Sequence, residues 1–168
     1  MPSPASIADI VLLGAGAAHR ELLRHLARRP LGRARVTLVS AEPEIPEPGR
    51  LPGLIRGDLT LAEACIDLGR LCVAAGVRLI LADPIGLDLT EPSIDLGARP
   101  LLRFDLLSAD LEGGSIQPAG GDAGLALSPL GGFHDRLVAL EQALPDGARL
   151  AVVGGGAIAP ELALALAW

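Results

Sequence analysis

The 168-residue chain contains no lysine, asparagine or tyrosine, and its only aromatic residues are two phenylalanines and one tryptophan. Without lysine, neither Schiff-base catalysis nor a phosphate-binding P-loop is available. All 14 basic residues are therefore arginines, and 20 acidic residues give a formal net charge of −6. A chain with this balance and no basic stripe is not a nucleic-acid-binding platform.

Cysteine is also scarce, with only Cys65 and Cys72 present. If both lay on one helix, their Cα atoms would be about 10 Å apart, which is too far for a disulfide. The spacing matches neither CxxC nor CxxxxC, so structural thiols in a reduced cytoplasm are the simpler interpretation, and a redox pair or metal ligands are the alternatives. No Ser/His/Asp arrangement and no metal-ligand spacing is present, so we predict no metal site.

No apolar run has the features that targeting or membrane spanning requires. The apolar run near the N-terminus follows Asp9 and has no preceding arginine, which excludes the positive start of a signal peptide. Residues 150–168 carry one charge, Glu161, but three consecutive glycines and Pro160 favour a strand, a turn and a helix over a membrane span. We expect a cytoplasmic protein.

Two glycine-rich turns are the most informative features that the sequence does contain. Each follows a short apolar run, 10–13 or 150–153, and opens a segment with helical periodicity. In such a turn the first glycine permits a tight bend, and the second lets the backbone approach a diphosphate at the helix N-terminus. Two dinucleotide sites are predicted, the first at Gly14, Ala15, Gly16, Ala17, Ala18 and His19, the second at Gly154, Gly156 and Ala159.

The order of the remaining elements predicts an α/β fold. Residues 7–40 form one βαβ unit, with strands at 7–13 and 36–39 and a helix at 17–29 between them. The arginines of this helix are interpreted as a solvated face, with a phosphate-binding or partner surface as the alternative. The later segments are an irregular crossover at 41–53, a helix at 61–75 that is broken near its middle, a strand at 77–81, a β-meander at 85–89, 93–96 and 103–107, a loop at 111–132 and a helix at 133–144. We predict a three-layer Rossmann-like domain over 1–145 with a β-meander insert, followed at 146–168 by the start of a second, truncated βαβ domain.

Four ordered segments carry a family resemblance: VLLGAG with His19; GRLPGLIRG followed by EACIDL; FDLLS; and VVGGG through PELA. Together they resemble the pyridine nucleotide-disulfide oxidoreductases, FAD- and NAD(P)-binding flavoproteins. The likeness is greatest to the type II NADH dehydrogenase branch, including versions fused ahead of selenide, water dikinase. The absence of a redox-active cysteine pair is consistent with that branch.

The resemblance implies FAD at Gly14 and Gly16 and NAD(P)H at the second turn. Hydride would pass from NAD(P)H to the flavin and then to a quinone or another small acceptor. Glu161 matches the catalytic helix glutamate near the two reacting rings, and Pro52 and Gly53 match the loop beside the flavin. His19 is either a flavin-pocket residue or a helix-start residue that caps or is solvated, and His25 and His134 are expected at the surface.

Several positions depart from the family pattern. Ser40 stands where an acid usually accepts hydrogen bonds from the ribose, so this site is expected to recognise the ribose weakly or differently. Pro84 replaces a residue whose backbone amide reads the adenine, and Glu112 aligns with a turn that approaches the flavin. Asp67 and Asp105 are the other carboxylates with a conceivable function, although hydrogen bonding at a turn or strand end is favoured.

The length is the largest departure, because the second dinucleotide domain would lack its later strands. We expect an N-terminal portion that is completed by a missing C-terminal half or by a homo-oligomer, with peripheral membrane contact left open. The alternative function is a catalytically inert nucleotide-binding or interaction module, such as a split or fused selenium-metabolism protein or a degenerate fragment. A third is a single-cofactor enzyme that uses NAD at the first turn.

Overall fold

A computed structural model describes residues 7–111, 125–127, 132–145 and 147–167. The chain divides into two units. Unit 1 comprises residues up to Pro43 and Asp67–Glu112, and unit 2 comprises Glu44–Ile66 and the segment from Gly113 onward. We describe each unit by itself. The domain boundary expected at 145/146 stays a prediction.

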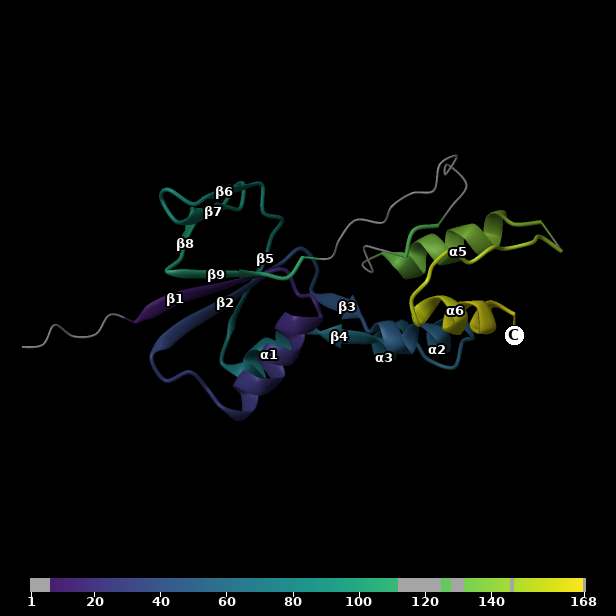
Figure 1. The fold of residues 1–168 in the computed structure, drawn as a ribbon, viewed down its shortest axis with the longest axis horizontal. Coiled ribbons are helices and arrows are strands. Elements are labelled where there is room, and N and C mark those ends of the chain that lie inside the picture. Colours follow the sequence, from purple (N-terminus) through teal and green to yellow (C-terminus); the bar gives the residue numbers. More distant parts are fainter. Residues whose placement is uncertain (1–6, 112–124, 128–131, 146, 168) are drawn as a thin grey trace, which may run out of the picture. The chain divides into compact units, whose positions relative to one another are not determined.

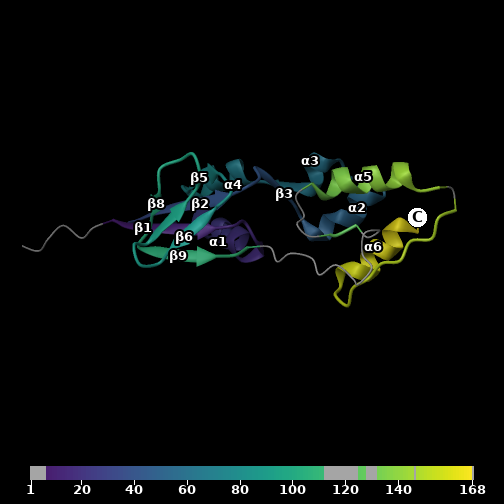
Figure 2. The ribbon, with the colours of Figure 1, turned by 90° about the horizontal axis from the view of Figure 1, so that it is seen from above.

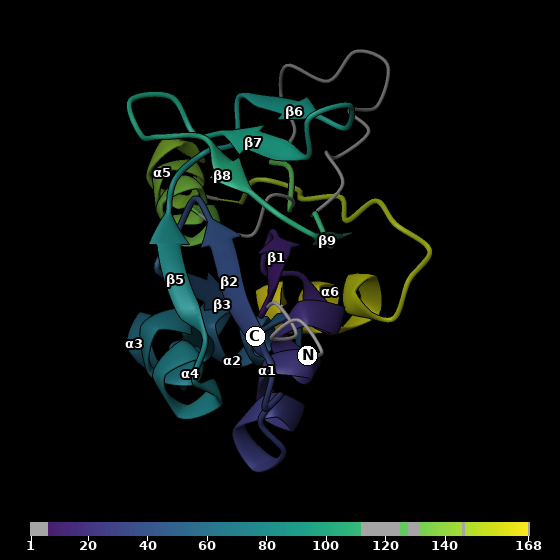
Figure 3. The ribbon, with the colours of Figure 1, turned by 90° about the vertical axis from the view of Figure 1, so that its left-hand side faces the viewer.

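Unit 1 is built on a four-stranded parallel sheet with the order β5-β2-β1-β9 (Figures 1 and 3). The strands are β1 (Ala8–Leu13), β2 (Ala34–Ser40), β5 (Arg78–Leu81) and β9 (Leu106–Ala109). Leu13 pairs with Val39 on one side and with Ala109 on the other. The α/β class and the parallel Rossmann-type sheet are therefore confirmed.

Helices α1 (Ala17–Arg28) and α4 (Leu68–Ala75) pack against each other and form the second layer of this unit. Leu12 and Leu38 are fully buried and alternate with the residues that face the meander, so they point toward the helices. Both helices end at residues that typically end helices. Pro30 follows α1, and Gly76 ends α4 in the left-handed region at φ 65°.

The predicted meander forms the third layer, with β6 (Gly86–Asp88), β7 (Ser93–Asp95) and β8 (Leu102–Arg103) in an antiparallel sheet. Its buried Ile94 and Leu96 pack with residues of β1, β2 and β5. The single strand expected at 103–107 is wrong, because the chain divides there into β8 and β9. The break occurs where the Asp105 amide donates to the Asp9 carbonyl at 2.8 Å, which turns the chain onto β1 and into the parallel sheet.

The segment expected to be an irregular crossover contains regular elements instead. They are β3 (Glu44–Pro46), the 3-10 helix η1 (Pro48–Arg50) and α2 (Leu51–Ile55), and β3 pairs with β4 (Cys65–Asp67). The break expected in the 61–75 helix is confirmed, since β4 separates α3 (Leu61–Ala64) from α4. Cys65 and Cys72 thus lie on different elements, and no disulfide joins them.

Unit 2 has its own apolar core, in which α2 packs against α6 (Ile158–Leu166) and buried residues of α5 (Phe133–Ala143) join them (Figure 2). The strand expected at 150–153 does not form, and Val153 is 81% exposed. A parallel strand needs a neighbour to satisfy its amides and carbonyls, and no described strand of unit 2 pairs with this segment. Most of the loop expected at 111–132 lies outside the described residues.

Among the helices that the structure describes, none combines the length and the apolar character needed to cross a membrane. The longest of them, α1, has 12 residues, and about 20 apolar residues are required.

Candidate functional site

The first glycine turn lies directly after β1, at the carboxyl edge of the parallel sheet. Its neighbours β2 and β9 lie on opposite sides of β1, so the chain connections diverge from this point, which is where open α/β sheets bind their ligands. Gly14 has φ 85°, and a Cβ there would lie 2.5 Å from the Asp110 carbonyl oxygen. Glycine is therefore required at this position by both conformation and space.

The second glycine of the turn, Gly16, is the N-cap of α1 and has no side chain with which to cap the helix. The helix is capped instead by the carboxylate of Asp110, which follows β9 and is far from Gly16 in the sequence. It accepts a hydrogen bond from the His19 amide at 2.9 Å, while the Gly16 amide donates to the Asp110 carbonyl at 3.1 Å. A Cβ on Gly16 would overlap the Asp110 carboxylate.

Asp110 was not among the residues predicted from the sequence. The available signal was its place immediately after the strand in FDLLSA, since parallel strands present their carboxyl ends at one edge of a sheet. Only the pairing of Leu13 with Ala109 shows that Asp110 stands beside Gly14. Glu112, which was expected to face the cofactor, lies outside the described residues.

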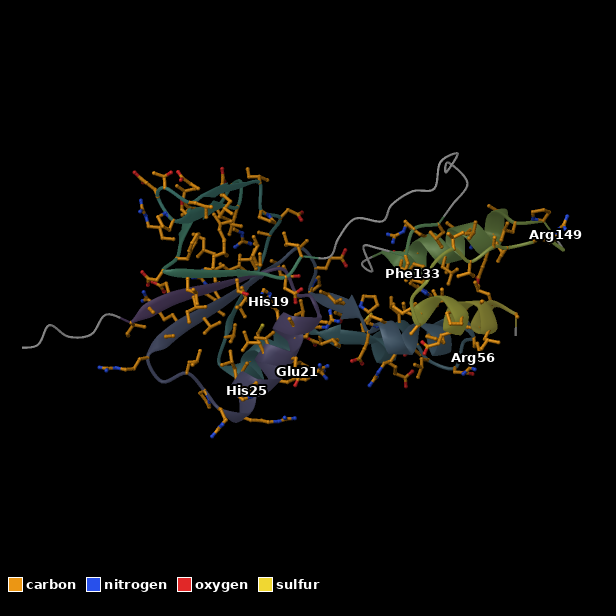
Figure 4. All side chains as sticks on the ribbon, in the orientation of Figure 1. His19, Glu21, His25, Arg56, Phe133 and Arg149 are labelled. Atoms are coloured by element: carbon orange, nitrogen blue, oxygen red, sulfur yellow. The ribbon has the colours of Figure 1, made fainter. Side chains whose placement is uncertain are left out.

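His19 is 2% exposed and holds the turn to the neighbouring strand (Figure 4). Its Nδ1 lies 2.6 Å from the Gly14 carbonyl oxygen, and its Nε2 lies 2.9 Å from the Ser108 hydroxyl. Because a carbonyl can only accept, Nδ1 carries a proton, and in the neutral ring Nε2 accepts from Ser108. The alternative of a solvated helix-start histidine is wrong, because the ring is buried against β9.

Arg20 corrects the expectation that the arginines of α1 form a solvated face. It is 6% exposed, and its guanidinium donates to the Ala15 carbonyl at 2.8 Å, inside the glycine turn. Within the described part of the chain, no carboxylate forms an ion pair with it. A largely desolvated positive charge thus lies beside the turn.

The other histidines differ from each other. His25 is exposed on α1, as expected (Figure 4). His134, also expected at the surface, is partly buried, and its Nδ1 has no hydrogen-bond partner among the described residues. It lies in the first turn of α5, the helix whose Phe133 and Leu137 belong to the core of unit 2.

Ser40, the predicted ribose position, is buried at the end of β2. Its hydroxyl donates to the Glu42 carbonyl at 2.9 Å and accepts from the Glu42 amide at 3.3 Å. Its own carbonyl accepts from the Ala82 amide at 2.9 Å. The hydroxyl therefore stabilises the local turn, and Pro84 lies exposed beyond the neighbouring strand.

Asp67 and Asp105 have the structural roles that were favoured for them. Asp67 is the N-cap of α4 and accepts from the Arg70 amide at 2.8 Å. Asp105 accepts from the Asp9 amide at 2.7 Å, where the chain enters β9.

The remaining predicted site residues belong to unit 2. Pro52 and Gly53 lie in α2, and the Gly53 carbonyl accepts from the amides of Asp58 and Leu59 at 2.8 and 3.1 Å. A Cβ on Gly53 would lie 3.0 Å from the Leu59 side chain. The structure thus gives Gly53 a packing role, whereas its predicted contact with a flavin stays a prediction.

The second glycine turn lacks the geometry of the first. Its glycines have no positive φ, a Cβ on Gly156 would meet nothing within 4 Å, and one on Gly154 would make an ordinary 3.4 Å contact with Ala159. Glu161 is exposed in the first turn of α6, where a carboxylate interacts favourably with the helix dipole. In the described ranges no cluster of three or more His, Cys, Asp or Glu side chains could hold a metal ion.

No family model and no curated protein matches the chain. Solved structures match its fold, and oxidoreductases are among them. NADH:rubredoxin oxidoreductase from Clostridium acetobutylicum has a TM-score of 0.68 and 18% identity, over 95% of this chain and 42% of that one. Putidaredoxin reductase, in its covalent complex with putidaredoxin, has a TM-score of 0.70 and 20% identity, over 96% and 40%.

The sulfide:quinone oxidoreductase from the hyperthermophilic bacterium Aquifex aeolicus matches with a TM-score of 0.62 and 14% identity, over 81% of this chain and 33% of that one. At these identities the likeness shows the fold. The chain spans less than half the length of these three structures.

Proposed function

We propose that this chain is part of an FAD-dependent NAD(P)H oxidoreductase and that unit 1 binds the flavin dinucleotide at the first glycine turn. The observation that carries the proposal is the left-handed Gly14 followed by Gly16 at the start of α1, at the point where the connections of a parallel sheet diverge. The fold shared with NADH:rubredoxin oxidoreductase and sulfide:quinone oxidoreductase supports it.

The backbone of the turn suits a diphosphate. Because Gly16 has no side chain, a diphosphate can approach the backbone closely. The first turn of α1 is exposed at Ala17 and Ala18 and presents the positive end of the helix. His19 would hold the turn in shape through Gly14 and Ser108, and Ser40 would lie toward the ribose. Among the described residues at this edge, the Asp110 carboxylate does not suit an anionic ligand, because it already lies over Gly16.

In the complete protein, NAD(P)H would bind at Gly154, Gly156 and Ala159. When bound, the flavin supplies the hydride acceptor, and the protein contributes binding and orientation. Glu161 would set the geometry of the reacting rings, with Pro52 and Gly53 beside the flavin. The segment before the second turn would then have to pair as a strand with parts of the protein beyond this chain, or with a second copy.

The electron acceptor that we propose is a quinone or another small molecule. The names of two matched structures, NADH:rubredoxin oxidoreductase and putidaredoxin reductase, make a small redox protein the alternative. We also propose a cytoplasmic location. Within the family, the type II NADH dehydrogenase branch remains our proposed assignment.

The proposal is tested by measuring whether the chain retains FAD. The purified chain is incubated with FAD and desalted, and its visible absorption spectrum is recorded. We expect retained flavin bands, and we expect their loss in Gly16→Val, whose side chain would block close approach, but not in the matched variant Gly156→Val. A folded wild-type chain that retains no FAD would contradict the proposal for this chain.

Two observations favour a second candidate, the inert nucleotide-binding or interaction module. The Asp110 carboxylate over Gly16 and the exposed segment 150–153 are both consistent with a chain that no longer performs hydride transfer. This candidate predicts that any retained flavin is not reduced by NADH. Binding of NADH without FAD would instead indicate the single-cofactor enzyme.

A further inference from the structure

Asp110, which follows β9, caps the N-terminus of α1 from outside the helix. Its carboxylate accepts from the amide of His19, the third residue of the helix, at 2.9 Å. This is the hydrogen bond that an aspartate at the N-cap position would make, and here Gly16 stands at that position and cannot make it. The carboxylate also fills the space that the missing Gly16 side chain leaves.

A carboxylate and a diphosphate compete for the same position at the N-terminus of α1. Both are anions, both accept from the first amides of a helix, and both are stabilised by the positive end of its dipole. The space over Gly16 admits one of them, because even a Cβ there would overlap the carboxylate. Two negative groups in that space would also repel each other strongly in a partly desolvated setting.

We propose that Asp110 is a resident anionic ligand of the α1 N-terminus that the diphosphate of a dinucleotide must displace, so that Asp110 sets the affinity of the site. This inference rests on the proposed dinucleotide function of the first glycine turn. It assigns to Asp110 a role in affinity and none in the chemistry.

The main chain of Asp110 is fixed to the glycine turn and to β1. The Asp110 main chain is held on both sides, since its amide donates to the Leu13 carbonyl at 2.9 Å and its carbonyl accepts from the Gly16 amide. Because the main chain is held, displacement would take place by rotation of the Asp110 side chain. The buried Arg20 guanidinium, bonded to the Ala15 carbonyl, keeps a positive charge beside the turn for whichever anion is present.

The test compares three variants of the full chain. Asp110→Asn removes the charge but keeps an oxygen that can cap α1, and Asp110→Ala removes both. Asp88→Asn is the matched control, since it removes one charge from the meander and keeps an oxygen for the Thr90 and Glu91 amides. FAD binding is titrated by flavin fluorescence, and inorganic pyrophosphate binding is titrated by thermal shift.

We expect both Asp110 variants to bind FAD and pyrophosphate about tenfold more tightly than the wild type, the scale of one carboxylate's interaction with a helix end, with Asp88→Asn unchanged. Without ligand, the melting temperature of Asp110→Ala should be lower than that of Asp110→Asn, because only the alanine variant loses the side-chain cap of α1. FAD binding by the wild type with no gain in either Asp110 variant would overturn this inference and leave the proposed function standing.

Two further outcomes separate the hypotheses. Tighter pyrophosphate binding in the Asp110 variants, with FAD bound by none of the proteins, would support the resident ligand and contradict the flavin function. If all four proteins bind neither FAD nor pyrophosphate, both proposals are wrong.

Discussion

The His19 ring and the Ser108 hydroxyl are hydrogen-bonded across two elements of unit 1, with Nε2 and Oγ 2.9 Å apart. One residue lies in the first turn of α1 and the other in β9, separated by 89 positions in sequence. Since His19 Nδ1 also contacts the Gly14 carbonyl, the ring connects the glycine turn to the strand that completes the ligand edge. The shape of the turn therefore depends on a contact that forms only after β9 has joined the sheet.

This contact is testable by a double-mutant cycle. We expect Ser108→Ala to lower the free energy of unfolding by about 1 kcal/mol, because it leaves a buried ring nitrogen without its partner. His19→Ala should lower it by more, since it also removes the contact with the Gly14 carbonyl. Urea unfolding followed by circular dichroism should yield a coupling energy of about 1 kcal/mol, and strictly additive effects would show that the two side chains do not interact.

The two glycine turns should respond differently to alanine. Gly14→Ala places a Cβ at positive φ and within 3 Å of the Asp110 carbonyl oxygen and the Leu111 side chain, so we expect a loss of at least about 1–2 kcal/mol in unfolding free energy. Gly156→Ala is the matched control, because its Cβ would meet nothing. Its effect should stay within about 0.5 kcal/mol, and equal losses in both variants would contradict the structural difference between the turns.

The stability of unit 1 should depend on an ion pair at the start of β1. Arg35 donates to both carboxylate oxygens of Asp9 at 2.7 Å, and this hydrogen bonding lowers the pKa of Asp9 from its ordinary value of 3.8. A depressed pKa in the folded state stabilises the protein above the unfolded pKa and ceases to do so as pH falls through the folded one. Asp9→Asn should therefore be less stable than wild type at pH 7, with a deficit that disappears in acid below pH 3.8.

Arg35→Gln breaks the same pair from the other side and should show the same pH window. Hydrogen bonding to Asp9 raises the pKa of Arg35, and the charge of the nearby Asp105 carboxyl adds to this effect. High salt should reduce both deficits, because the pair is exposed. A deficit of Asp9→Asn that is the same at pH 7 and in acid would exclude the ion pair as its cause.

The two cysteines should differ in reactivity. Cys72 is buried, and desolvation raises the pKa of its thiol to about 11. At pH 8 this thiol is almost entirely protonated and shielded, so a thiol-specific reagent should modify it only at the rate of unfolding. Cys65→Ser isolates Cys72 for the measurement, and rapid modification of the folded variant would contradict the burial of α4 against α1.

Local signals were sufficient for the first half of unit 1. The apolar run before Gly14, the helical periodicity after it and Pro30 together predicted β1, α1 and β2 to within two residues, because each signal acts within one element. The same signals failed at residues 103–107, where one apolar stretch serves two sheets. Which sheet each half joins depends on Asp105 reaching Asp9, 96 positions away.

The strand expected at 150–153 failed for a related reason. Its composition matches that of β1, yet a strand forms only when a neighbouring strand satisfies its amides and carbonyls. In unit 1 that neighbour is present for β1, whereas in unit 2 no described strand takes this place. Composition alone does not distinguish the two situations.

By itself, the sequence determined the α/β class and the position of the first glycine turn, because these follow from periodicity and turn residues within a short stretch. Only the tertiary structure decided that His19 and Arg20 are buried beside that turn and that the Asp110 carboxylate caps α1. Those contacts exist because the parallel pairing of β1 with β9 brings residues about 90 positions apart to one edge of the sheet. Pairing between distant strands depends on the packing of the whole unit, which no local pattern encodes.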